Sequence, residues 1–265
     1  MGVNIHPTAI VNPDAEIGDG VEIGPYSIIG ENVKIGEGTK IGPCVSIEGW
    51  TKIGKRCQIL QGTVIGTPAQ DTHYKGGRSF VEIGDDNLIR EYVTIHRGTG
   101  EDTTTHIGNK NFLMAYSHIA HNCWVGNGVV IANMGTLAGY VKIEDRVMIG
   151  GLTAIHQYVR VGAYAMIGGC AKVVKDIPPF TMADGHPASL WGLNTVGLRR
   201  ANFSLKTRNY LLKAYKILFR SGLNTSQALE KIENELEEIP EVKYLCDFIR
   251  SSKRGICKER KRGDE

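Results

Sequence analysis

The sequence predicts an all-β solenoid, a parallel β-helix of hexapeptide repeats, followed by a C-terminal helical domain. First, counting every sixth residue from Ile5 to Val173 gives 29 positions, and 26 of them hold Ile, Val or Leu. A six-residue period fits neither an amphipathic helix nor an alternating strand. Second, the chain has 33 glycines, which suit the many turns of such a coil. Third, the period ends after Val173, and helical spacing begins after Ser204.

Each hexad is expected to form a short strand and a turn. The aliphatic residue and a small or branched residue four positions later can both point inward. Three hexads would close a triangular coil of 18 residues, stacked about 4.8 Å from the next coil. The stretch from residue 5 to residue 173 would make about nine to ten coils. The period alone does not give the hand of the helix.

The hexad register lapses twice. Residues 5–66 are regular, so we expect scaffold there and little chemistry. Residues 67–80 are polar and contain glycine, which predicts an external loop, and loops on rigid scaffolds often carry function. Residues 98–106 are more acidic, and we expect only a solvated excursion there.

Helical signals occupy the C-terminal part of the chain. Pro178 and Pro179 end the last strand. We predict one helix from an N-cap at Ser204 to Gly222, a second from an N-cap at Thr225 to Glu238, and a third from Pro240 to Ser252. The predicted domains are therefore 1–190 (β-helix) and 191–265 (helices that help to cover its open end). The basic tail from residue 253 is expected to be a solvated end, with weak anion or nucleic-acid contact as the alternative.

Composition excludes several classes of protein. The net charge is +3, from 31 basic and 28 acidic residues, so no nucleic-acid partner is implied. Six cysteines are scattered without a C-x-x-C pair, which favours reduced thiols in a cytoplasmic protein. The hexads begin by Ile5, leaving no room for a signal peptide, and no apolar run approaches the ~18 residues of a membrane span.

Candidate catalytic residues follow from the 18-residue coil. Residues 18 apart should lie one coil apart on the same face, so His121, Gly139 and Gln157 should form a ladder with rungs of about 4.8 Å. This ladder offers a base, a bare backbone N–H and an amide. Neighbouring columns would run through Asn122, Tyr140 and Tyr158, and through Ala120, Ala138 and His156.

Six segments resemble a known family. They are QDTHY (70–74), VTIHRGT (93–99), SHIAH (117–121), TLAGY (136–140), AIHQY (154–158) and GLNTVGLRR (192–200). In this order they resemble the acyl-carrier-protein-dependent UDP-N-acetylglucosamine O-acyltransferases, the first acyltransferases of lipid A biosynthesis. The resemblance covers the chain almost end to end. It implies a left-handed β-helix, a homotrimer with sites between neighbouring subunits, acyl carrier protein as donor, a UDP-sugar as acceptor, and neither a metal nor a cofactor of its own.

The resemblance also implies roles for single residues. His121 matches the general base for the sugar 3-hydroxyl, which attacks the thioester of a 3-hydroxyacyl chain. Gly139 matches the backbone N–H that stabilises the oxyanion. Gly169 matches a position that leaves room for a long acyl chain. The glucosamine contacts would be Asp71 and His118, and the nucleotide and phosphate contacts would be His156, Gln157, Asn194 and Arg200.

Some positions depart from the family pattern. His73 stands in the substrate-binding loop where a lysine is often found, and Tyr140 follows the oxyanion glycine where a histidine is often found. Asn122 follows the base in place of an aspartate and cannot stabilise an imidazolium by charge. Val196 and Ala201 replace an acidic and a basic contact. These departures leave a 3-amino sugar nucleotide, which would give an amide, as an alternative acceptor.

Three other functions remain compatible with the residues. One is an acetyl-CoA-dependent sugar acetyltransferase, although Gly169 and the long helical part favour a carrier-bound long chain. Another is a trimeric β-helix hydratase with zinc bound by histidines from adjacent subunits, for which His96, His118, His121 and His156 are the candidates. The last is a catalytically inactive assembly module. The sequence does not give the acyl length.

Overall fold

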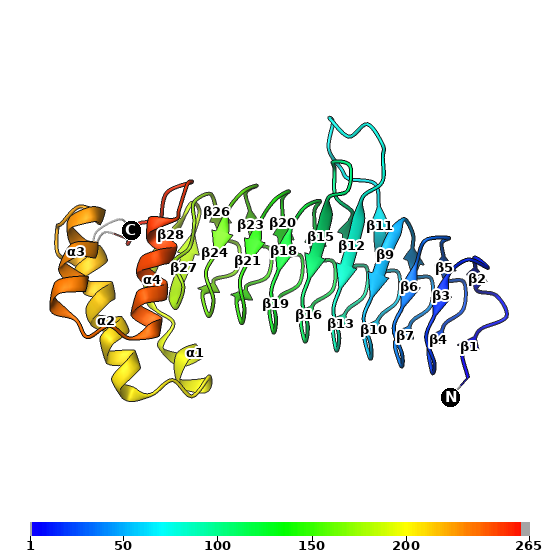
Figure 1. Ribbon diagram of the computed structural model, residues 1–265, viewed down its shortest axis with the longest axis horizontal. Coiled ribbons are helices and arrows are strands. Elements are labelled where there is room, and N and C mark those ends of the chain that lie inside the picture. Colours follow the sequence, from blue (N-terminus) through cyan, green and yellow to red (C-terminus); the bar gives the residue numbers. More distant parts are fainter. Residues whose placement is uncertain (1, 261–265) are drawn as a thin grey trace.

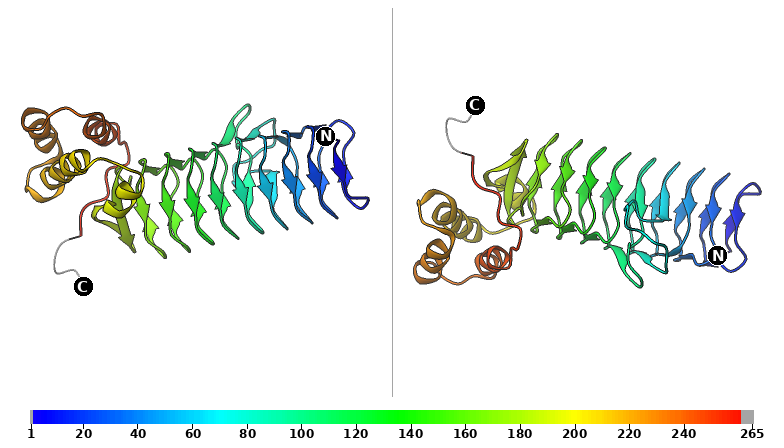
Figure 2. Two further views of the ribbon diagram at one scale, coloured as in Figure 1. Left: turned by 90° about the horizontal axis from the view of Figure 1, so that it is seen from below. Right: turned by 90° about the horizontal axis from the view of Figure 1, so that it is seen from above.

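The computed structural model describes residues 2–260 and shows a long triangular prism with helices at one end. Three parallel sheets form the walls of the prism, and Figure 1 shows one loop projecting from its side. Figure 2 shows that the helices lie at the end opposite the N-terminus. Sheet A comprises β1 (Asn4–Ile5), β4 (Glu22–Ile23), β7 (Lys40–Ile41), β10 (Gln58–Ile59), β13 (Leu88–Ile89), β16 (Phe112–Leu113), β19 (Val130–Ile131), β22 (Met148–Ile149), β25 (Met166–Ile167), β27 (Thr181–Gly185) and β28 (Ala188–Leu193).

The other two walls are built in the same way. Sheet B comprises β2 (Ile10–Val11), β5 (Ile28–Ile29), β8 (Ser46–Ile47), β11 (Val64–Thr67), β14 (Thr94–His96), β17 (His118–Ile119), β20 (Thr136–Leu137), β23 (Ala154–Ile155) and β26 (Lys172–Val173). Sheet C comprises β3 (Glu16–Ile17), β6 (Lys34–Ile35), β9 (Trp50–Ile53), β12 (Phe80–Ile83), β15 (Thr104–Ile107), β18 (Trp124–Val125), β21 (Lys142–Ile143) and β24 (Arg160–Val161).

The strand register confirms the predicted coil. Ile119 pairs with Leu137, and Leu137 pairs with Ile155, so one coil takes 18 residues wherever the hexads are unbroken. Sheet A holds nine parallel strands from β1 to β25, one for each coil. Where the register lapses, the coil is longer but the pairing resumes in phase: Ile65 pairs with Ile95 across the first loop.

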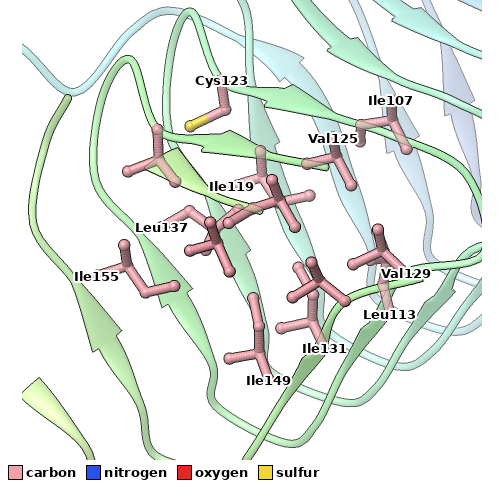
Figure 3. Close-up of a cluster of buried hydrophobic side chains, with 14 of the residues drawn as sticks. Ile107, Leu113, Ile119, Cys123, Val125, Val129, Ile131, Leu137, Ile149 and Ile155 are labelled. Carbon is pink, nitrogen blue, oxygen red and sulfur yellow. The ribbon is translucent and has the colours of Figure 1, made fainter. Parts of the chain in front are cut away.

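The core is a stack of aliphatic side chains. Figure 3 shows Ile119, Leu137 and Ile155 on successive coils, each turned into the prism and almost fully buried. Glycine after an inward residue is explained by close stacking as well as by turns. A Cβ on Gly36 would lie 2.6 Å from the carbonyl carbon of Gly54, closer than real contacts allow. At Gly36 the coils can therefore stack at strand spacing because this position lacks a side chain.

The C-terminal part differs from the prediction in its details. Antiparallel strands β27 and β28 extend sheet A, so the predicted boundary at residues 190 and 191 falls inside β28. Helices follow as α1 (Thr195–Arg200), α2 (Leu205–Arg220), α3 (Thr225–Glu235) and α4 (Pro240–Arg250). The hairpin and α1 were missed, because both are short and lack a clear periodic pattern.

Helix ends were predicted unevenly. The cap at Ser204 is confirmed, since its side chain accepts a hydrogen bond from the N–H of Thr207. The predicted cap at Thr225 is wrong, because Asn224 and Gln227 form a reciprocal capping box one residue earlier. Helix α3 ends at Glu235, three residues before the predicted end at Glu238.

The predicted solvated tail is also corrected. Residues 255–260 return along the end of the prism, where Ile256 pairs with Asp176 and Glu259 with Leu190. Cys257 is buried there. The backbone of this segment thus pairs with the end of the prism, where the sheet would otherwise be open. The rest of the predicted tail, residues 261–265, lies outside the described part of the chain. Within residues 2–260, no helix is long and apolar enough to cross a membrane.

Candidate active site

The predicted ladder lies along the edge of the prism where sheet B turns into sheet C. The turns after β17, β20 and β23 stack there: the N–H of Tyr140 donates to the carbonyl of His121 at 3.1 Å, and the N–H of Tyr158 donates to that of Gly139 at 3.2 Å. A Cβ built on Gly139 would lie 2.5 Å from Cε1 of His121. The expected juxtaposition of the imidazole and Gly139 is therefore confirmed, and a bare backbone is needed there to admit the ring.

Asn122 sets the orientation of the His121 imidazole. The Oδ1 atom of Asn122 accepts a hydrogen bond from the N–H of Thr99 at 3.0 Å and lies 3.0 Å from Nδ1 of His121. Because this amide oxygen can only accept, Nδ1 of His121 must carry the proton. The lone pair of the neutral ring is then on Nε2, as a general base requires. His121 is 7% exposed, so few other contacts compete for it.

Asp71 brings a carboxylate to the same ring. Its Oδ2 lies 3.9 Å from Nε2 of His121, and its Oδ1 accepts hydrogen bonds from the backbone and Nδ1 of His73. The N–H of His73 is the main cause that lowers the pKa of the Asp71 carboxyl. The imidazole of His73 is otherwise exposed. An ionised carboxylate therefore lies beside Nε2 of His121.

The external loop that carries Asp71 is fixed to the prism. Arg97 donates from Nη1 to the carbonyl of Gly66 at 3.0 Å and from Nη2 to the hydroxyl of Tyr74 at 3.0 Å. The excursion from Gly98 was expected to be merely solvated, and this is wrong: Thr99 contacts both Asn122 and, at 3.5 Å, Asp71. Sequence analysis could not find this, because no register relates residue 99 to residues 71 and 122.

Two further imidazoles, those of His96 and His118, lie near His121. Nδ1 of His118 is 2.7 Å from the hydroxyl of Thr94, and its ring meets that of His96 edge to face at 5.1 Å. Burial, and then His118 and His121, lower the pKa of His96 to about 4. Burial, and then His121, lower the pKa of His118. At neutral pH both rings are uncharged and leave His121 as the imidazole beside a carboxylate.

Aromatic rings flank the ladder on one side. Tyr140 stacks on Tyr158 with ring centroids 4.8 Å apart and meets the ring of His121 edge to face at 5.3 Å. Burial is the main cause that raises the pKa of the Tyr140 hydroxyl, so this phenol is neutral. It therefore packs against the ring of His121 without adding a charge there.

At the far end of the ladder, His156 and Gln157 are exposed on the third stacked turn. Nδ1 of His156 lies 2.8 Å from Nη2 of Arg254, which comes from the C-terminal segment. Sequence reasoning missed Arg254, because it placed this segment in a solvated tail and nothing in the local sequence indicates the return of the chain.

Three predicted residues lie on other edges of the same chain. Asn194 caps α1 and donates from Nδ2 to the carbonyl of Tyr164, in the turn from sheet C to sheet A, and Arg200 ends α1. Gly169 lies in the turn from sheet A to sheet B. One chain therefore does not bring these residues to His121, and a shared site would need a second subunit. Within residues 2–260, no three His, Cys, Asp or Glu side chains are grouped to hold a metal ion.

Comparison with known proteins gives consistent matches. Residues 176–257 match the family described as UDP-N-acetylglucosamine O-acyltransferase, domain 2, and residues 32–67 and 104–139 match the bacterial transferase hexapeptide family. The acyl-(acyl-carrier-protein)–UDP-N-acetylglucosamine O-acyltransferase of Thermodesulfovibrio yellowstonii is 57% identical over 96% of this chain and 99% of its own length. The corresponding protein of Syntrophobacter fumaroxidans is 49% identical over the same shares of the two chains.

Solved structures agree with the sequence matches. A UDP-N-acetylglucosamine acyltransferase from Bacteroides fragilis superposes with a TM-score of 0.94 at 44% identity, over 96% of this chain and 99% of that one. An Arabidopsis UDP-N-acetylglucosamine acyltransferase superposes with a TM-score of 0.86 at 36% identity, over 96% and 100% of the two chains. The predicted fold, a left-handed parallel β-helix with a C-terminal helical domain, is thereby confirmed.

Proposed function

Because this chain belongs to the family of acyl-carrier-protein-dependent UDP-N-acetylglucosamine O-acyltransferases, we propose that its active site is the edge between sheets B and C. The protein is an acyltransferase that moves a 3-hydroxyacyl chain from acyl carrier protein to the 3-position of UDP-N-acetylglucosamine, in lipid A biosynthesis. The main support for this location of the active site is the contact between His121 and Gly139.

His121 acts as the general base. Its Nδ1–H is directed to Asn122, so Nε2 takes the proton from the sugar 3-hydroxyl as the oxygen attacks the thioester carbonyl. The positive charge that appears on the imidazole lies near the carboxylate of Asp71, 3.9 Å from Nε2. Asp71 thus supplies some of the charge stabilisation that Asn122 cannot.

Gly139 stabilises the intermediate. Attack forms a C–O bond and a tetrahedral oxyanion, and the N–H of Gly139 has no hydrogen-bond acceptor among residues 2–260, so it is free to donate to that oxygen. Collapse breaks the C–S bond and releases the carrier's phosphopantetheine thiol, which takes the proton from His121. The reaction therefore needs no metal or cofactor held by this chain, and the phosphopantetheine belongs to the donor.

The complete site is proposed to form in a homotrimer. Asn194 and Arg200 from a neighbouring subunit would contact the nucleotide, and a neighbour's Gly169 would limit the acyl chain. The separation of these residues from His121 within one chain supports this arrangement. We place the protein in the cytoplasm, where its six free cysteines would stay reduced.

The test is direct assay of acyl transfer. Purified protein is incubated with UDP-N-acetylglucosamine or its 3-amino analogue and a panel of 3-hydroxyacyl-carrier thioesters, and product masses are measured. We expect an ester product, and the preferred thioester gives the acyl length. If only the 3-amino analogue gives a product, the acceptor is the 3-amino sugar nucleotide. If no pair of substrates gives a product, the proposed function is contradicted.

A paired substitution tests the base. His121→Ala should lower kcat by roughly 10²- to 10⁴-fold, the usual contribution of a general base. His6→Ala is the matched control, because His6 is exposed in the first coil. Equal rates for both variants would remove His121 from the mechanism.

A further inference from the structure

Arg254 is held in place beside the far end of the ladder. After α4 the chain turns back and is fixed to Asp176: Ser252 donates to Oδ2 of Asp176 at 2.7 Å, and the N–H of Asp176 donates to the carbonyl of Gly255 at 3.0 Å. Both contacts share Asp176, which is 2% exposed. The backbone on either side of Arg254 is therefore fixed, and its side chain reaches His156.

The charge of Arg254 is not neutralised by a carboxylate. Its Nε donates to the carbonyl of Val174 at 2.9 Å and its Nη2 contacts Nδ1 of His156 at 2.8 Å. Among residues 2–260, no Asp or Glu oxygen lies within 4.0 Å of it, whereas Arg160 and Arg220 both have carboxylate partners. A half-buried guanidinium held by neutral acceptors keeps its full charge and further N–H donors for an anion.

Arg254 also determines which nitrogen of His156 carries the proton. A guanidinium only donates hydrogen bonds, so Nδ1 of His156 must accept. The same nitrogen lies 3.2 Å from the carbonyl of Gln157, which would require a proton on Nδ1. Nδ1 cannot both accept and donate, and its shorter contact is the one with the guanidinium, so Nδ1 is the accepting nitrogen. The N–H of His156 is then on Nε2, which is left to donate.

The position of this pair along the ladder matches an anion in the substrate. The turn of His156 and Gln157 lies two coils beyond the turn of His121, which is about 10 Å at strand spacing. In the UDP-sugar, C1 is two ring atoms from C3, so a 3-hydroxyl at His121 would leave the diphosphate on C1 several ångströms away from the reacting oxygen. The site thus runs from the ionised Asp71 at the sugar end to the unneutralised Arg254 at the other end.

We propose that Arg254 and the Nε2–H of His156 form a subsite for the diphosphate of the UDP-sugar, in which Arg254 both binds the anion and positions His156. The proposal rests on the proposed function, because it takes the UDP-sugar as the acceptor. It assigns to the returning C-terminal segment a part in substrate binding, in addition to covering the end of the prism.

Binding without the acyl donor tests the subsite. Isothermal titration calorimetry is carried out with UDP-N-acetylglucosamine and with uridine on the wild type, Arg254→Gln, Arg254→Lys and Lys253→Gln. Lys253 is the matched control, an exposed cation on the adjacent residue. Arg254→Gln should bind the UDP-sugar roughly tenfold more weakly, as expected for the loss of one charge-assisted contact, and should bind uridine unchanged. Arg254→Lys keeps the positive charge but not the planar set of guanidinium N–H donors. Its affinity for the UDP-sugar should therefore lie between those of the wild type and Arg254→Gln.

Kinetics give an independent readout. Arg254→Gln should raise KM for the UDP-sugar by a similar factor and leave kcat nearly unchanged, since the reacting atoms lie two coils away. Equal binding of the UDP-sugar by the wild type and Arg254→Gln would overturn the subsite alone, and so would a parallel loss of uridine binding, which indicates a merely structural role. If Arg254→Gln does not fold, Arg254→Lys carries the comparison. A wild type that binds no UDP-N-acetylglucosamine contradicts the proposed function and the subsite together.

Discussion

At the scale of single residues, the ladder depends on one missing side chain. The imidazole of His121 occupies the space that a Cβ on Gly139 would need. The ring is also held by Asn122, whose oxygen is held in turn by Thr99. The imidazole of His121, the proposed base, is therefore fixed by contacts on two sides.

Gly139→Ala should displace the imidazole without unfolding the protein. The added methyl would lie 2.5 Å from Cε1 of His121, and a shift of about 1 Å in a catalytic group costs on the order of 100-fold in rate. Steady-state kinetics and thermal melting are the measurements. The control is Gly30→Ala, where the nearest atom is 3.3 Å away in a coil far from the site. Full activity in Gly139→Ala would show that the ring has room to move.

His96 should make the protein less stable in acid. The pKa of its buried ring is about 4, below the ordinary value of 6.5, so the unfolded chain binds a proton between these values and the folded chain does not. The contribution of the neutral His96 ring to the free energy of unfolding is then fully present above about pH 6.5. It is lost as the pH drops toward 4. His96 should account for about 2 kcal/mol of the loss between about pH 7 and about pH 5.

Urea unfolding at these two pH values measures the effect. His96→Asn removes the titrating ring, so the variant should lose less stability on acidification than the wild type. His118 also has a lowered pKa and stays in both proteins, so some loss remains. Identical losses in the two proteins would show that His96 does not carry the effect.

At the scale of elements, α4 is attached to the last coils by a partly buried polar cluster. The hydroxyl of Tyr244 donates to the carboxylate of Glu144 and accepts from the N–H of Ala163 at 3.0 Å. Burial is the main cause that raises the pKa of this hydroxyl, so it stays protonated as a donor. Arg160 lies between Glu144 and the ring of Phe248, with its Cζ 4.2 Å from the ring centroid.

Tyr244→Phe should lower the free energy of unfolding by about 1–3 kcal/mol, because it leaves the half-buried carboxylate of Glu144 and the N–H of Ala163 with one partner fewer. Thermal or urea unfolding measures the change. Tyr26→Phe is the control, because Tyr26 is exposed on a turn of the second coil. An equal effect of both substitutions would mean that the cluster does not fix α4.

At the scale of the whole molecule, the prism places the predicted substrate contacts on different edges. His121 lies between sheets B and C, Gly169 between A and B, and Asn194 near the turn between C and A. A rigid solenoid cannot fold these edges onto one another. Only association of chains would combine them into one site.

Mixed trimers test this arrangement. His121→Ala and Arg200→Ala should each be nearly inactive at low UDP-sugar, but a trimer that contains both has sites where an intact His121 meets an intact Arg200 of the neighbouring chain. Co-expression should therefore restore up to about a quarter of wild-type activity for random three-fold assembly. Activity no greater than the sum of the separate variants would place both residues in sites within one chain, and light scattering would report the size of the assembly.

The helical and loop segments show where prediction from the sequence was limited. The cap at Ser204 was predicted, since capping is local, whereas the β27–β28 hairpin and the return of residues 255–260 were missed. The hairpin is short and has no periodic pattern, and residues 255–260 pair with Asp176 and Leu190, which are far away in the chain. The loop at residues 67–80 was predicted because it interrupts the register, but its attachment through Arg97 and Tyr74 was not.

The sequence by itself determined the coil and the ladder. An aliphatic residue at every sixth position gives an 18-residue turn, and that spacing places Gly139 against His121 by arithmetic, without any knowledge of long-range packing. The tertiary structure decided what surrounds the ladder: Thr99 on Asn122, Asp71 near His121 and Arg254 on His156. These contacts join the periodic coil to segments outside the period, so they depend on how loops and the C-terminal segment pack against the prism.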